Sequence, residues 1–539
     1  MLLIVPRYVT VDGAAHVGGA ALIRDELQGA GELHTRYVEF RMLPVPNLVA
    51  GLALTSVMLV ADPATAEKLL QIAYVIVLPL ALLYAVRSVG WDRDWLAFLA
   101  IPLTFTFAFQ YGFYDFSFGV AAFLLAAGYV WRHRLSPSMR EGLIFGVLAL
   151  LLYLIHLVPF LELLIFLAIV WLFGLIQAWR AGGYQAARTA TRATLPLALG
   201  ILPSALLAGI FLVATRTGAP AEYLNPLLQA IGIASLALGL VTTQPLEIAV
   251  AVGLALTLGT LLLAVLWGRI QREGSAAGQT LRDADALFAY ATAALVIALV
   301  APAAVESGGS YIPERLALFP VYGLALWLAA QDIPNRLAGL TVAVSLLAAV
   351  GLGVLRLPTT LSLSGAAVEL EAVAPCLATQ STLFQADLAD LPTGPLRRTD
   401  PFGDEAGRVA AATRGHDLGN WEGTFPFFLY GNRLENDPFR WLLRNRDGLE
   451  VPPDVDIQAY RRRPYGTVDY VLVVGRRLAT ADTLASPGWA SLRAELDREY
   501  RRVAASTSGL VEVWERRDPR LQRDGDARRD MAGRSACAA

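Results

Sequence analysis

Long apolar runs alternate with short polar loops over the first two thirds of the chain. A helix needs about 17–25 apolar residues to cross a hydrocarbon core of ~30 Å. Ten runs approach that length, at 66–86, 95–110, 113–131, 141–158, 159–178, 193–215, 246–267, 285–304, 312–330 and 337–355. His156 and Pro159 mark the break between the fourth run and the fifth. The pattern predicts a transmembrane bundle of about ten helices over residues 66–355.

Arginine is concentrated in alternate loops between these runs. Cytoplasmic loops of membrane proteins carry the excess of Lys and Arg. The arginine-rich loops hold Arg87 and Arg93; Arg132, Arg134 and Arg140; Arg180, Arg188 and Arg192; Arg269, Arg272 and Arg282; and Arg336. The turns near 110–113, 157–160 and 304–311 hold no Lys or Arg, and 216–245 holds Arg216 alone. We therefore expect both ends of the chain to lie outside the cytoplasm.

Residues 1–65 precede the first run and are expected to form an extracytoplasmic loop. The apolar positions of 13–29 fall on one side of a helical projection, which predicts an amphipathic helix on the membrane surface. The apolar stretch 48–61 is too short to span and predicts a second interfacial helix. An N-terminus outside the cytoplasm must cross the membrane, and residues 2–5 are too short an apolar run for a signal peptide. This favours a further transmembrane helix before residue 1. The alternative is a short N-terminus that crosses the membrane together with the first helical hairpin.

The last third of the chain has a different pattern. Residues 470–475 and 509–514 are typical of short buried strands, and 484–500 is typical of a polar helix between them. Residues 356–517 therefore predict a soluble α/β domain, on the same outer side as the first loop. The short run 226–241 predicts an interfacial or re-entrant helix. Residues 518–539 are polar and predict a disordered tail.

Composition supports this division and excludes some classes of protein. Only 17% of the residues are charged, against roughly 25% in a soluble domain. Of 90 charged residues, 39 lie in 1–355 and 51 in the remainder. A net charge of -2 with Lys68 as the only lysine argues against nucleic acid as a partner. Cys376 and Cys537 have no metal-binding spacing and can form at most one disulfide. Abundant arginine suggests a GC-rich bacterial genome, and hence the bacterial inner membrane.

The sequence Val-Asp-Gly-Ala-Ala-His at 11–16 is the strongest local feature. Asp12 precedes the predicted helix 13–29, and His16 follows four residues later, so a carboxylate and an imidazole could share one face. The simpler interpretation is that Asp12 caps the helix and His16 faces solvent. The plan around this motif favours a functional role: an acidic residue at the head of a first outer loop, a Pro-x-Pro-Asn run at 44–47, many spans and an outer soluble domain.

That plan resembles the GT-C superfamily of integral membrane glycosyltransferases. The resemblance covers most of the chain in architecture, although its motifs are short. It implies a polytopic α-helical membrane protein, GT-C-like, with a C-terminal extracytoplasmic α/β domain. It also implies a polyprenyl-phosphate-linked sugar as donor and Asp12 as the catalytic base or a metal-binding residue. Many members carry Asp-Glu where this chain has Asp12-Gly13, so either a second carboxylate or the imidazole of His16 would complete the site.

A phosphate leaving group requires a cation, and Arg315 is the best-placed arginine. It lies in Tyr311-Ile312-Pro313-Glu314-Arg315, at the head of the run 312–330. An arginine can hold a phosphate through two parallel hydrogen bonds. By positional analogy with the superfamily we assign donor-phosphate binding to Arg315 and Tyr311. A salt bridge to Glu314, or snorkelling of Arg315 to the interface, is the alternative.

Further polar residues fall in other outer segments. Asp115, His156 and His16 could bind a divalent cation or the acceptor, but their separations define no particular metal. Asp115 could equally belong to an aromatic belt, and His156 to a buried cluster with Tyr153 and Glu162. In the C-terminal domain, Trp421 could stack on a sugar while Asp417 and Glu422 bind its hydroxyls. Ordinary turn chemistry explains the polar residues of that stretch equally well.

The sequence thus predicts a glycosyltransferase that moves a sugar from a polyprenyl-phosphate donor to a glycan, lipid or protein acceptor outside the cytoplasm. A divalent cation could take part, and no nucleotide is needed. The alternative is a non-enzymatic protein, either a lipid or solute transporter or an envelope scaffold. Transporters place ionisable residues near the middle of their spans. Here the candidate residues collect at the predicted outer surface, which favours chemistry at that face.

Overall fold

The computed structural model describes residues 1–41, 43–216, 220–273, 282–305, 309–389, 402–444, 452–518 and 537. The chain divides into two compact units. Unit 1 combines 1–43, 49–72 and 357–539, and unit 2 combines 44–48 and 73–356. Two helices, α3 (Pro63–Val89) and α15 (Asn335–Glu371), contribute residues to both units. Each unit is described by itself.

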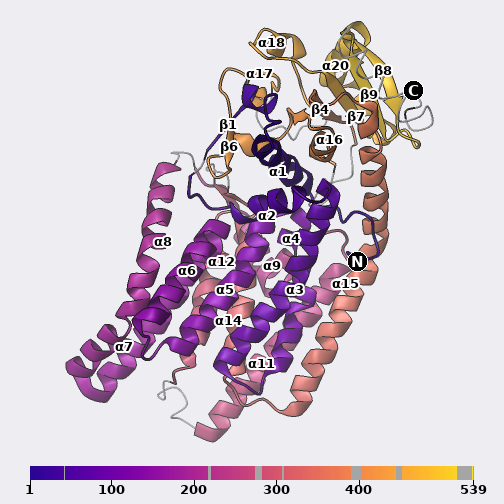
Figure 1. Cartoon of the computed structure of the whole chain (residues 1–539). Coiled ribbons are helices and arrows are strands. Elements are labelled where there is room, and N and C mark those ends of the chain that lie inside the picture. The colour runs from indigo at the N-terminus through magenta and orange to yellow at the C-terminus, as the bar shows by residue number, and fades with distance from the viewer. Residues whose placement is uncertain are drawn as a thin grey trace. The chain divides into compact units, whose positions relative to one another are not determined.

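Unit 2 is helical (Figure 1). Besides its parts of α3 and α15, its longer helices are α5 (Tyr114–His133), α6 (Met139–Ile155), α7 (Leu157–Ala193), α8 (Leu195–Ala214), α11 (Glu247–Glu273), α12 (Asp285–Val300) and α14 (Leu318–Ala329). Its short elements are η2 (Asp94–Ala100), η3 (Pro102–Thr104), α4 (Phe107–Tyr111), α9 (Pro226–Ala234), α10 (Ala237–Leu240), β2 (Ala304–Val305), β3 (Gly309–Ser310) and α13 (Ile312–Leu316).

Seven helical segments among the described residues are long and apolar enough to cross a membrane. They are Pro63–Val89, Tyr114–His133, Leu157–Ala193, Leu195–Ala214, Glu247–Arg272, Ile312–Ala329 and Asn335–Cys376. The chain is therefore a multi-pass membrane protein by the length and apolarity of its helices. The expected run 95–110 is instead broken into η2, η3 and α4, because Pro102 cannot continue a helix. The run expected at 285–304 forms the shorter α12, and 141–158 forms the 17-residue α6.

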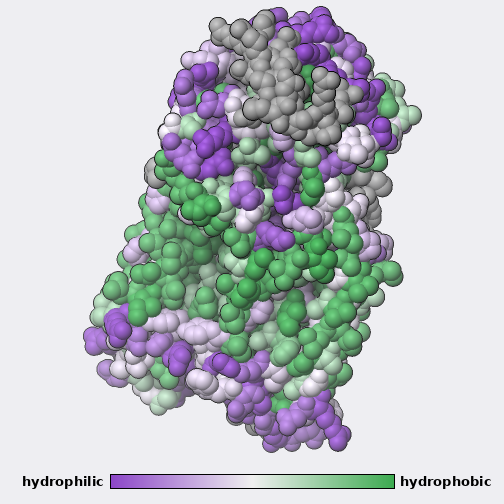
Figure 2. All heavy atoms as spheres, turned by 45° about the vertical axis from the view of Figure 1, so that its right-hand side comes forward, coloured by the Kyte–Doolittle hydropathy of each residue, from purple (hydrophilic) through white to green (hydrophobic). Residues whose placement is uncertain are grey.

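The outer faces of the long helices are apolar. Figure 2 shows this face of the helices as a broad green area. Leu206, Ile210 and Val213 of α8 and Leu256 and Leu263 of α11 are among the exposed side chains. Exposed apolar surface on this scale is what lipid chains cover. The break expected near His156 is confirmed, since α6 ends at Ile155 and α7 begins at Leu157.

The sheet of unit 1 has five strands in the order β5-β4-β7-β9-β8. The strands are β4 (Thr382–Asp387), β5 (His416–Asp417), β7 (Tyr470–Val474), β8 (Tyr500–Ala505) and β9 (Val511–Arg516). β4 is parallel to both β5 and β7, whereas β9 is antiparallel to β7 and β8. The expected strands at 470–475 and 509–514 and the helix between them, α20 (Pro487–Glu499), are thus confirmed.

Helices cover both faces of this sheet. Along β7, Val471 and Val473 enter one core with Trp489 and Leu492 of α20. Tyr470, Leu472 and Val474 enter the opposite core, which includes Leu370 at the end of α15 and Val409 of α16 (Ala406–Thr413). Successive side chains of a strand point to opposite faces, so a fully apolar strand requires two cores. The remaining elements are η5 (Ala374–Cys376), η6 (Trp421–Thr424), α17 (Pro438–Trp441), α18 (Ile457–Arg461), η7 (Arg476–Leu478) and α19 (Ala481–Ala485).

The N-terminal segment is an integral part of unit 1. It comprises α1 (Gly13–Leu27), η1 (His34–Arg36), β1 (Val38–Phe40) and α2 (Val49–Met58). β1 pairs with β6 (Tyr430–Asn432) in an antiparallel ribbon. The sequence predicts α1 on the membrane surface, but eleven of its fifteen residues are buried and it packs against α16 and α2. The alanines and glycines at 14, 15 and 18–21 explain this, since they allow other backbones to approach on several sides.

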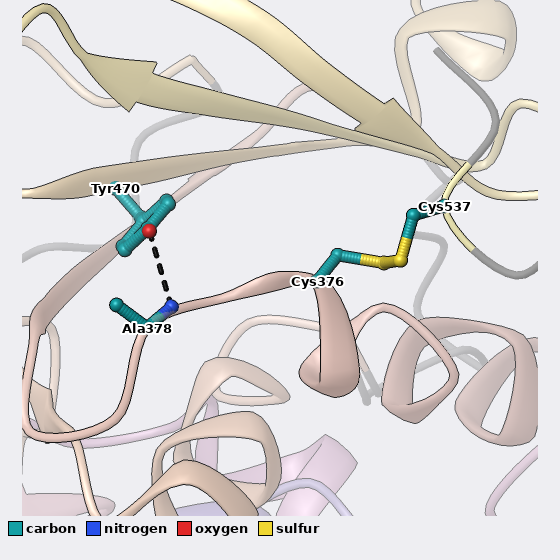
Figure 3. Close-up of a disulfide and its surroundings, with 4 residues drawn as sticks. All are labelled: Cys376, Ala378, Tyr470 and Cys537. Atoms are coloured by element: carbon teal, nitrogen blue, oxygen red, sulfur yellow. Dashed lines mark hydrogen bonds between the residues drawn. A yellow bond between two sulfur atoms is a disulfide. The ribbon is translucent and has the colours of Figure 1, made fainter. Parts of the chain in front are cut away.

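A disulfide joins Cys376 to Cys537, and Tyr470 of β7 accepts a hydrogen bond from the Ala378 amide beside it (Figure 3). The single disulfide allowed by the cysteine count is therefore present. Most of the tail predicted to be disordered, 519–536 and 538–539, lies outside the described residues.

Candidate functional site

Asp12 stands at the N-terminus of α1, and its side chain is 5% exposed. It occupies the N-cap position, yet its carboxylate makes no capping hydrogen bond, so capping does not explain the residue. The first backbone hydrogen bond of the helix joins the His16 amide to the Asp12 carbonyl at 3.0 Å. Asp12 and His16 therefore lie one turn apart, as the four-residue spacing predicts.

His16 is hydrogen-bonded to Glu422 of η6. The Nδ1 atom of His16 contacts one carboxylate oxygen of Glu422, and the Tyr430 hydroxyl donates a hydrogen bond to the other. The side-chain amide of Asn420 donates a hydrogen bond to the Ala15 carbonyl at 3.0 Å, and its Oδ1 atom accepts one from the Glu422 backbone amide at 3.0 Å. The structure thus brings His16 and Glu422 together, with Asn420 fixing the loop that carries the carboxylate.

Asp404, just before α16, completes the group and was not predicted from the sequence. Its carboxylate accepts a hydrogen bond from the Trp421 indole nitrogen at 3.1 Å. Burial, together with the negative charges of Asp12, Asp417 and Glu422, raises the pKa of Asp404 well above its ordinary value. These four carboxyl groups come from four separate segments of unit 1. We call them the acidic group.

Close packing between α1 and α16 makes the acidic group possible. A Cβ atom on Gly18 would lie 3.2 Å from the Cα atom of Gly407, and one on Gly407 would overlap the Ala14 carbonyl. Side chains at either position would push the two helices apart. Because Asp12 precedes α1 and Asp404 precedes α16, the two glycines keep the starts of these helices close together.

Asp417 lies in β5 and lines a small cavity with His416, Asn420 and Tyr430. Its carboxylate accepts a hydrogen bond from the Gly419 amide at 2.8 Å, but burial still raises its pKa to about 7. A carboxyl group with a pKa near neutral can both accept and release a proton under physiological conditions. Asp417 thus has the turn role that the sequence allows, through its hydrogen bond with Gly419, and it also has a raised pKa.

Aromatic side chains border the acidic group. Trp421 lies 5.7 Å from both Phe425 and Phe428, and the His16 ring lies 6.4 Å from Trp421, measured between ring centroids. Phe427 contacts Phe425 and Phe428 at 5.1 Å each. These four aromatic residues keep part of their surface exposed. We call them the aromatic rim; such rings can stack on the apolar face of a sugar.

A second group of candidate residues lies in unit 2 around Arg315 of α13. The guanidinium carbon of Arg315 lies 3.7 Å from the centre of the Phe113 ring, a cation–π contact. The NH1 atom of Arg315 lies 3.4 Å from Nε2 of His156. Both side chains are buried, 9% and 7% exposed. The structure therefore brings together Arg315 and His156, for which the sequence predicts different roles.

Tyr311 introduces α13 and contacts Tyr111 and Phe113, at 4.7 and 6.3 Å between ring centroids. Its φ of 53° is in the left-handed region, which is strained for a tyrosine. The Arg315 backbone amide donates a hydrogen bond to the Tyr311 carbonyl at 3.2 Å. The turn at Tyr311 therefore fixes the position of the Arg315 backbone. Asp115 lies in the first turn of α5, two residues after Phe113.

The cluster of Tyr153, His156 and Glu162 considered from the sequence does not form. Glu162 accepts a hydrogen bond from the Tyr290 hydroxyl at 2.9 Å, and Tyr153 donates to the Pro44 carbonyl at 3.1 Å. His156 caps α7, with Nδ1 accepting a hydrogen bond from the Val158 amide at 3.1 Å.

No group of three or more His, Cys, Asp or Glu residues is arranged to hold a metal within the described ranges. Comparison of the chain with protein-family models, curated proteins and solved structures gives no match. The candidate residues thus form two groups: Asp12, His16, Asp404, Asp417, Trp421 and Glu422 in unit 1, and Tyr311, Arg315 and His156 in unit 2, with Asp115 on the helix that follows Phe113.

Proposed function

We propose that this protein is a membrane glycosyltransferase of the GT-C type, with Asp12 as its catalytic base. It transfers a sugar from a polyprenyl-phosphate donor to an acceptor outside the cytoplasm. The observation that carries the proposal is the acidic group of unit 1. A buried carboxylate that does not cap its helix belongs to a group with Asp404 and Asp417, whose pKa values are raised, beside a partly exposed aromatic rim. Perturbed carboxyl groups of this kind gather at catalytic sites.

In the proposed reaction an acceptor hydroxyl attacks the anomeric carbon of the donor sugar. The new C–O bond forms on the face opposite the phosphate, and the bond from the anomeric carbon to the phosphate oxygen breaks. That oxygen leaves with the electron pair, while Asp12 takes the hydroxyl proton. The raised pKa of neighbouring Asp404 favours its neutral form, which reduces like charge beside Asp12.

The other assigned residues bind the two substrates. Arg315, supported by Tyr311, binds the donor phosphate through charge-assisted hydrogen bonds. Trp421 stacks on the acceptor, and Glu422 and Asp417 bind its hydroxyls. His16 and Asp115 are further candidates for acceptor or divalent-cation binding. The pairing of His16 with Glu422 orients that carboxylate, which favours an acceptor role for both.

The proposed setting is the bacterial inner membrane, with unit 1 outside the cytoplasm. The arginine bias of the loops supports this orientation. The disulfide between Cys376 and Cys537 supports it independently, because thiols of cytoplasmic proteins are normally kept reduced. An outer location also fits a donor whose lipid stays in the bilayer while its sugar reaches the surface.

The decisive experiment measures sugar transfer by the full chain in lipid nanodiscs. The substrates are a panel of polyprenyl-phosphate sugars and membrane extracts that contain acceptors. Asp12→Asn should reduce transfer at least a hundredfold, because the amide cannot take a proton. Glu32→Gln, at an exposed residue of unit 1, is the matched control and should transfer normally. Full activity of Asp12→Asn, with the variant folded, would remove Asp12 as the base.

A transporter remains the second candidate, because unit 2 buries ionisable residues. Arg356 of α15 pairs with Glu247 of α11 at 2.8 Å, and the two side chains are 1% and 0% exposed. Charged residues inside a bundle mark solute pathways in many transporters. Against this, Arg356 also donates to the carbonyls of Phe105 and Leu240, which is a structural use of the charge. Uptake of labelled lipid or sugar by proteoliposomes, unaffected by Asp12→Asn, would favour the transporter.

A further inference from the structure

The helix α7 changes direction before its end. Gly182 and Gly183 have non-helical backbone angles, and the φ of Gly183, 61°, is in the left-handed region that favours glycine. Residues 184–193 therefore form a separate short helix, which leads through Thr194 into α8 (Figure 1, lower left). Because α7 and α8 are both long and apolar enough to cross a membrane, the segment between them lies at a membrane surface. We call residues 184–193 the surface helix.

The surface helix has a basic face. Tyr184, Arg188 and Arg192 are spaced four residues apart, which places them on one side of a helix, and all three are exposed. Ala187, away from this face, is 5% exposed. The sequence 163–221 contains no Asp or Glu, and neither arginine forms an ion pair with any residue that the structure describes. Two like charges one turn apart repel each other, so an anion that contacts both is favoured there.

The start of α6 adds a third arginine at this end of the helices. Gly142, in the first turn of α6, packs against the first turn of α8, where a Cβ atom on Gly142 would lie 2.4 Å from the Pro196 carbonyl oxygen. Arg140 therefore lies at the same end of the bundle as the surface helix, and it is exposed. The carboxylate of Glu141 lies 2.9 Å from Nδ1 of His133 and also belongs to the cap of α6. Glu141 is thus engaged within its own turn.

Exposed apolar side chains precede and follow the surface helix. Trp179, in α7 before the bend, is 57% exposed, and Leu195 and Leu199 of α8 are 52% and 46% exposed. Tryptophan is enriched where hydrocarbon meets headgroups, and two leucines four residues apart share one face of a helix. A phospholipid matches this order of side chains, since its phosphate stays at the membrane surface while its acyl chains enter the hydrocarbon core.

We propose that the surface helix is a binding site for an anionic phospholipid. Arg188 and Arg192 donate charge-assisted hydrogen bonds to its phosphate, and its acyl chains lie against Leu195 and Leu199. The site goes beyond the proposed function, because it uses none of the residues of the proposed reaction and lies in a loop that the arginine bias assigns to the cytoplasm. Phosphatidylglycerol fits the site better than phosphatidylcholine, whose choline group would bring a positive charge to the two arginines.

The test compares lipid binding by the full chain with binding by two double variants that lose the same charge. Arg188→Gln/Arg192→Gln removes the proposed donors to the phosphate, and Arg336→Gln/Arg462→Gln removes two exposed arginines elsewhere. Native mass spectrometry in detergent measures the binding of dioleoyl phosphatidylglycerol, with dioleoyl phosphatidylcholine as the control lipid. All four positions are exposed, so we expect both variants to fold.

We expect Arg188→Gln/Arg192→Gln to bind phosphatidylglycerol roughly tenfold more weakly, because its charge-assisted hydrogen bonds are lost. The control variant should bind this lipid within about twofold of the natural protein. Phosphatidylcholine binding should not change in either variant. Equal losses in the two variants would show that net charge alone attracts the lipid, and would overturn the site. Unaltered phosphatidylglycerol affinity in Arg188→Gln/Arg192→Gln would overturn it as well.

Two further probes identify the source of the phosphate. Dihexanoyl phosphatidylglycerol has the same headgroup but short chains, and it should bind more weakly than the dioleoyl lipid because it covers less of α8. Inorganic phosphate in large excess should displace little of the dioleoyl lipid. Equal affinity for the short-chain lipid, or full displacement by inorganic phosphate, would overturn the assignment of this site to a phospholipid.

A measurement on the unmodified protein covers the case in which a variant does not fold. Hydrogen exchange of the backbone amides is followed in nanodiscs of phosphatidylglycerol and in nanodiscs of phosphatidylcholine. We expect slower exchange of residues 184–193 in phosphatidylglycerol, since a bound lipid restrains the surface helix. The largely buried α5 should exchange equally in the two lipids. Equal exchange of residues 184–193 in both would contradict the proposal.

Discussion

The two candidate groups are opposite in charge and are built in different ways. The acidic group of unit 1 gathers carboxyl groups from four segments, and two glycines hold its helices together. The Arg315 group of unit 2 is cationic and aromatic, and its residues lie at helix ends joined by tight turns. The difference corresponds to the two tasks of the proposed reaction. Carboxyl groups suit proton removal from an acceptor, and a guanidinium on an aromatic ring suits a phosphate.

A second contrast, between a buried ion pair of unit 1 and one of unit 2, gives the largest expected effect. In unit 1, Arg408 of α16 makes two hydrogen bonds to Glu67 and one to Glu405. Replacing Arg408 by Met removes its positive charge from beside two buried carboxyl groups, and should lower the free energy of unfolding of unit 1 by about 3–5 kcal/mol. Urea unfolding followed by tryptophan fluorescence measures this, with exposed Arg462→Met as the control.

The corresponding change in unit 2 should cost less. When Arg356 is replaced by Met, Glu247 keeps hydrogen bonds from the amides of Thr242 and Thr243, at 2.8 and 3.1 Å, and from both hydroxyls. The carboxylate therefore remains solvated by the protein. If Arg356→Met proved as destabilising as Arg408→Met in nanodiscs, the contrast between the two pairs would be lost.

Asp417 gives the next largest effect, through pH. Its folded-state pKa is about 7, against an ordinary value of 3.8, so the folded protein binds this proton more tightly than the unfolded chain. The resulting stability is complete below about pH 4 and is lost as the pH rises towards 7 and beyond. Asp417→Asn removes this loss, which amounts to at most ~4 kcal/mol.

The measurement is the unfolding free energy between pH 4 and pH 8. Asp417→Asn should show a shallower fall with pH than the natural protein, and exposed Asp482→Asn should not. Glu405, whose pKa burial also raises to about 7, leaves part of the slope in place. An unaltered slope in Asp417→Asn would show that this carboxyl group ionises normally.

The smallest effect distinguishes charge from shape at Arg315. Arg315→Lys keeps the positive charge but loses the planar stack on Phe113, and should weaken farnesyl phosphate binding by roughly tenfold. Arg315→Ala should weaken it more, and Asp12→Asn should leave it unchanged. If Asp12→Asn weakened phosphate binding as much as Arg315→Ala did, the assignment of separate tasks to the two groups would be wrong.

The length of the apolar runs predicted most of the long helices, because each of these helices contains enough consecutive apolar residues to be recognised. It failed at 95–110, where Pro102 divides the run into short turns. The strand at 470–474 was predictable from its continuous apolar run, and the strand at 511–516 from the valines and tryptophan at its start, which are typical strand residues. For α1 the pattern misled: small residues that look like one apolar face instead pack on several sides.

The site was only partly predictable for a related reason. Asp12 and His16 are one helical turn apart, so their proximity follows from local geometry. Asp404 joins the acidic group because α16 packs against α1, and no local sequence pattern predicts that contact. The Gly-Asp-Glu sequence at 403–405 is a plausible helix start, which is all that the sequence alone supports. His156 and Arg315 likewise meet only through tertiary packing.

The ribbon of β1 and β6 has a consequence for the order of synthesis. Val38 pairs with Asn432, and residues 73–356, the main part of unit 2, separate these partners in the chain. Because translation proceeds from the N-terminus, β1 emerges long before β6 and must wait for it. The helices of unit 2 can therefore enter the membrane first, while α1, Asp12 included, has yet to meet α16. In nascent chains stalled before residue 404, the acidic group cannot exist, so any transferase activity would arise only after the membrane helices have been made.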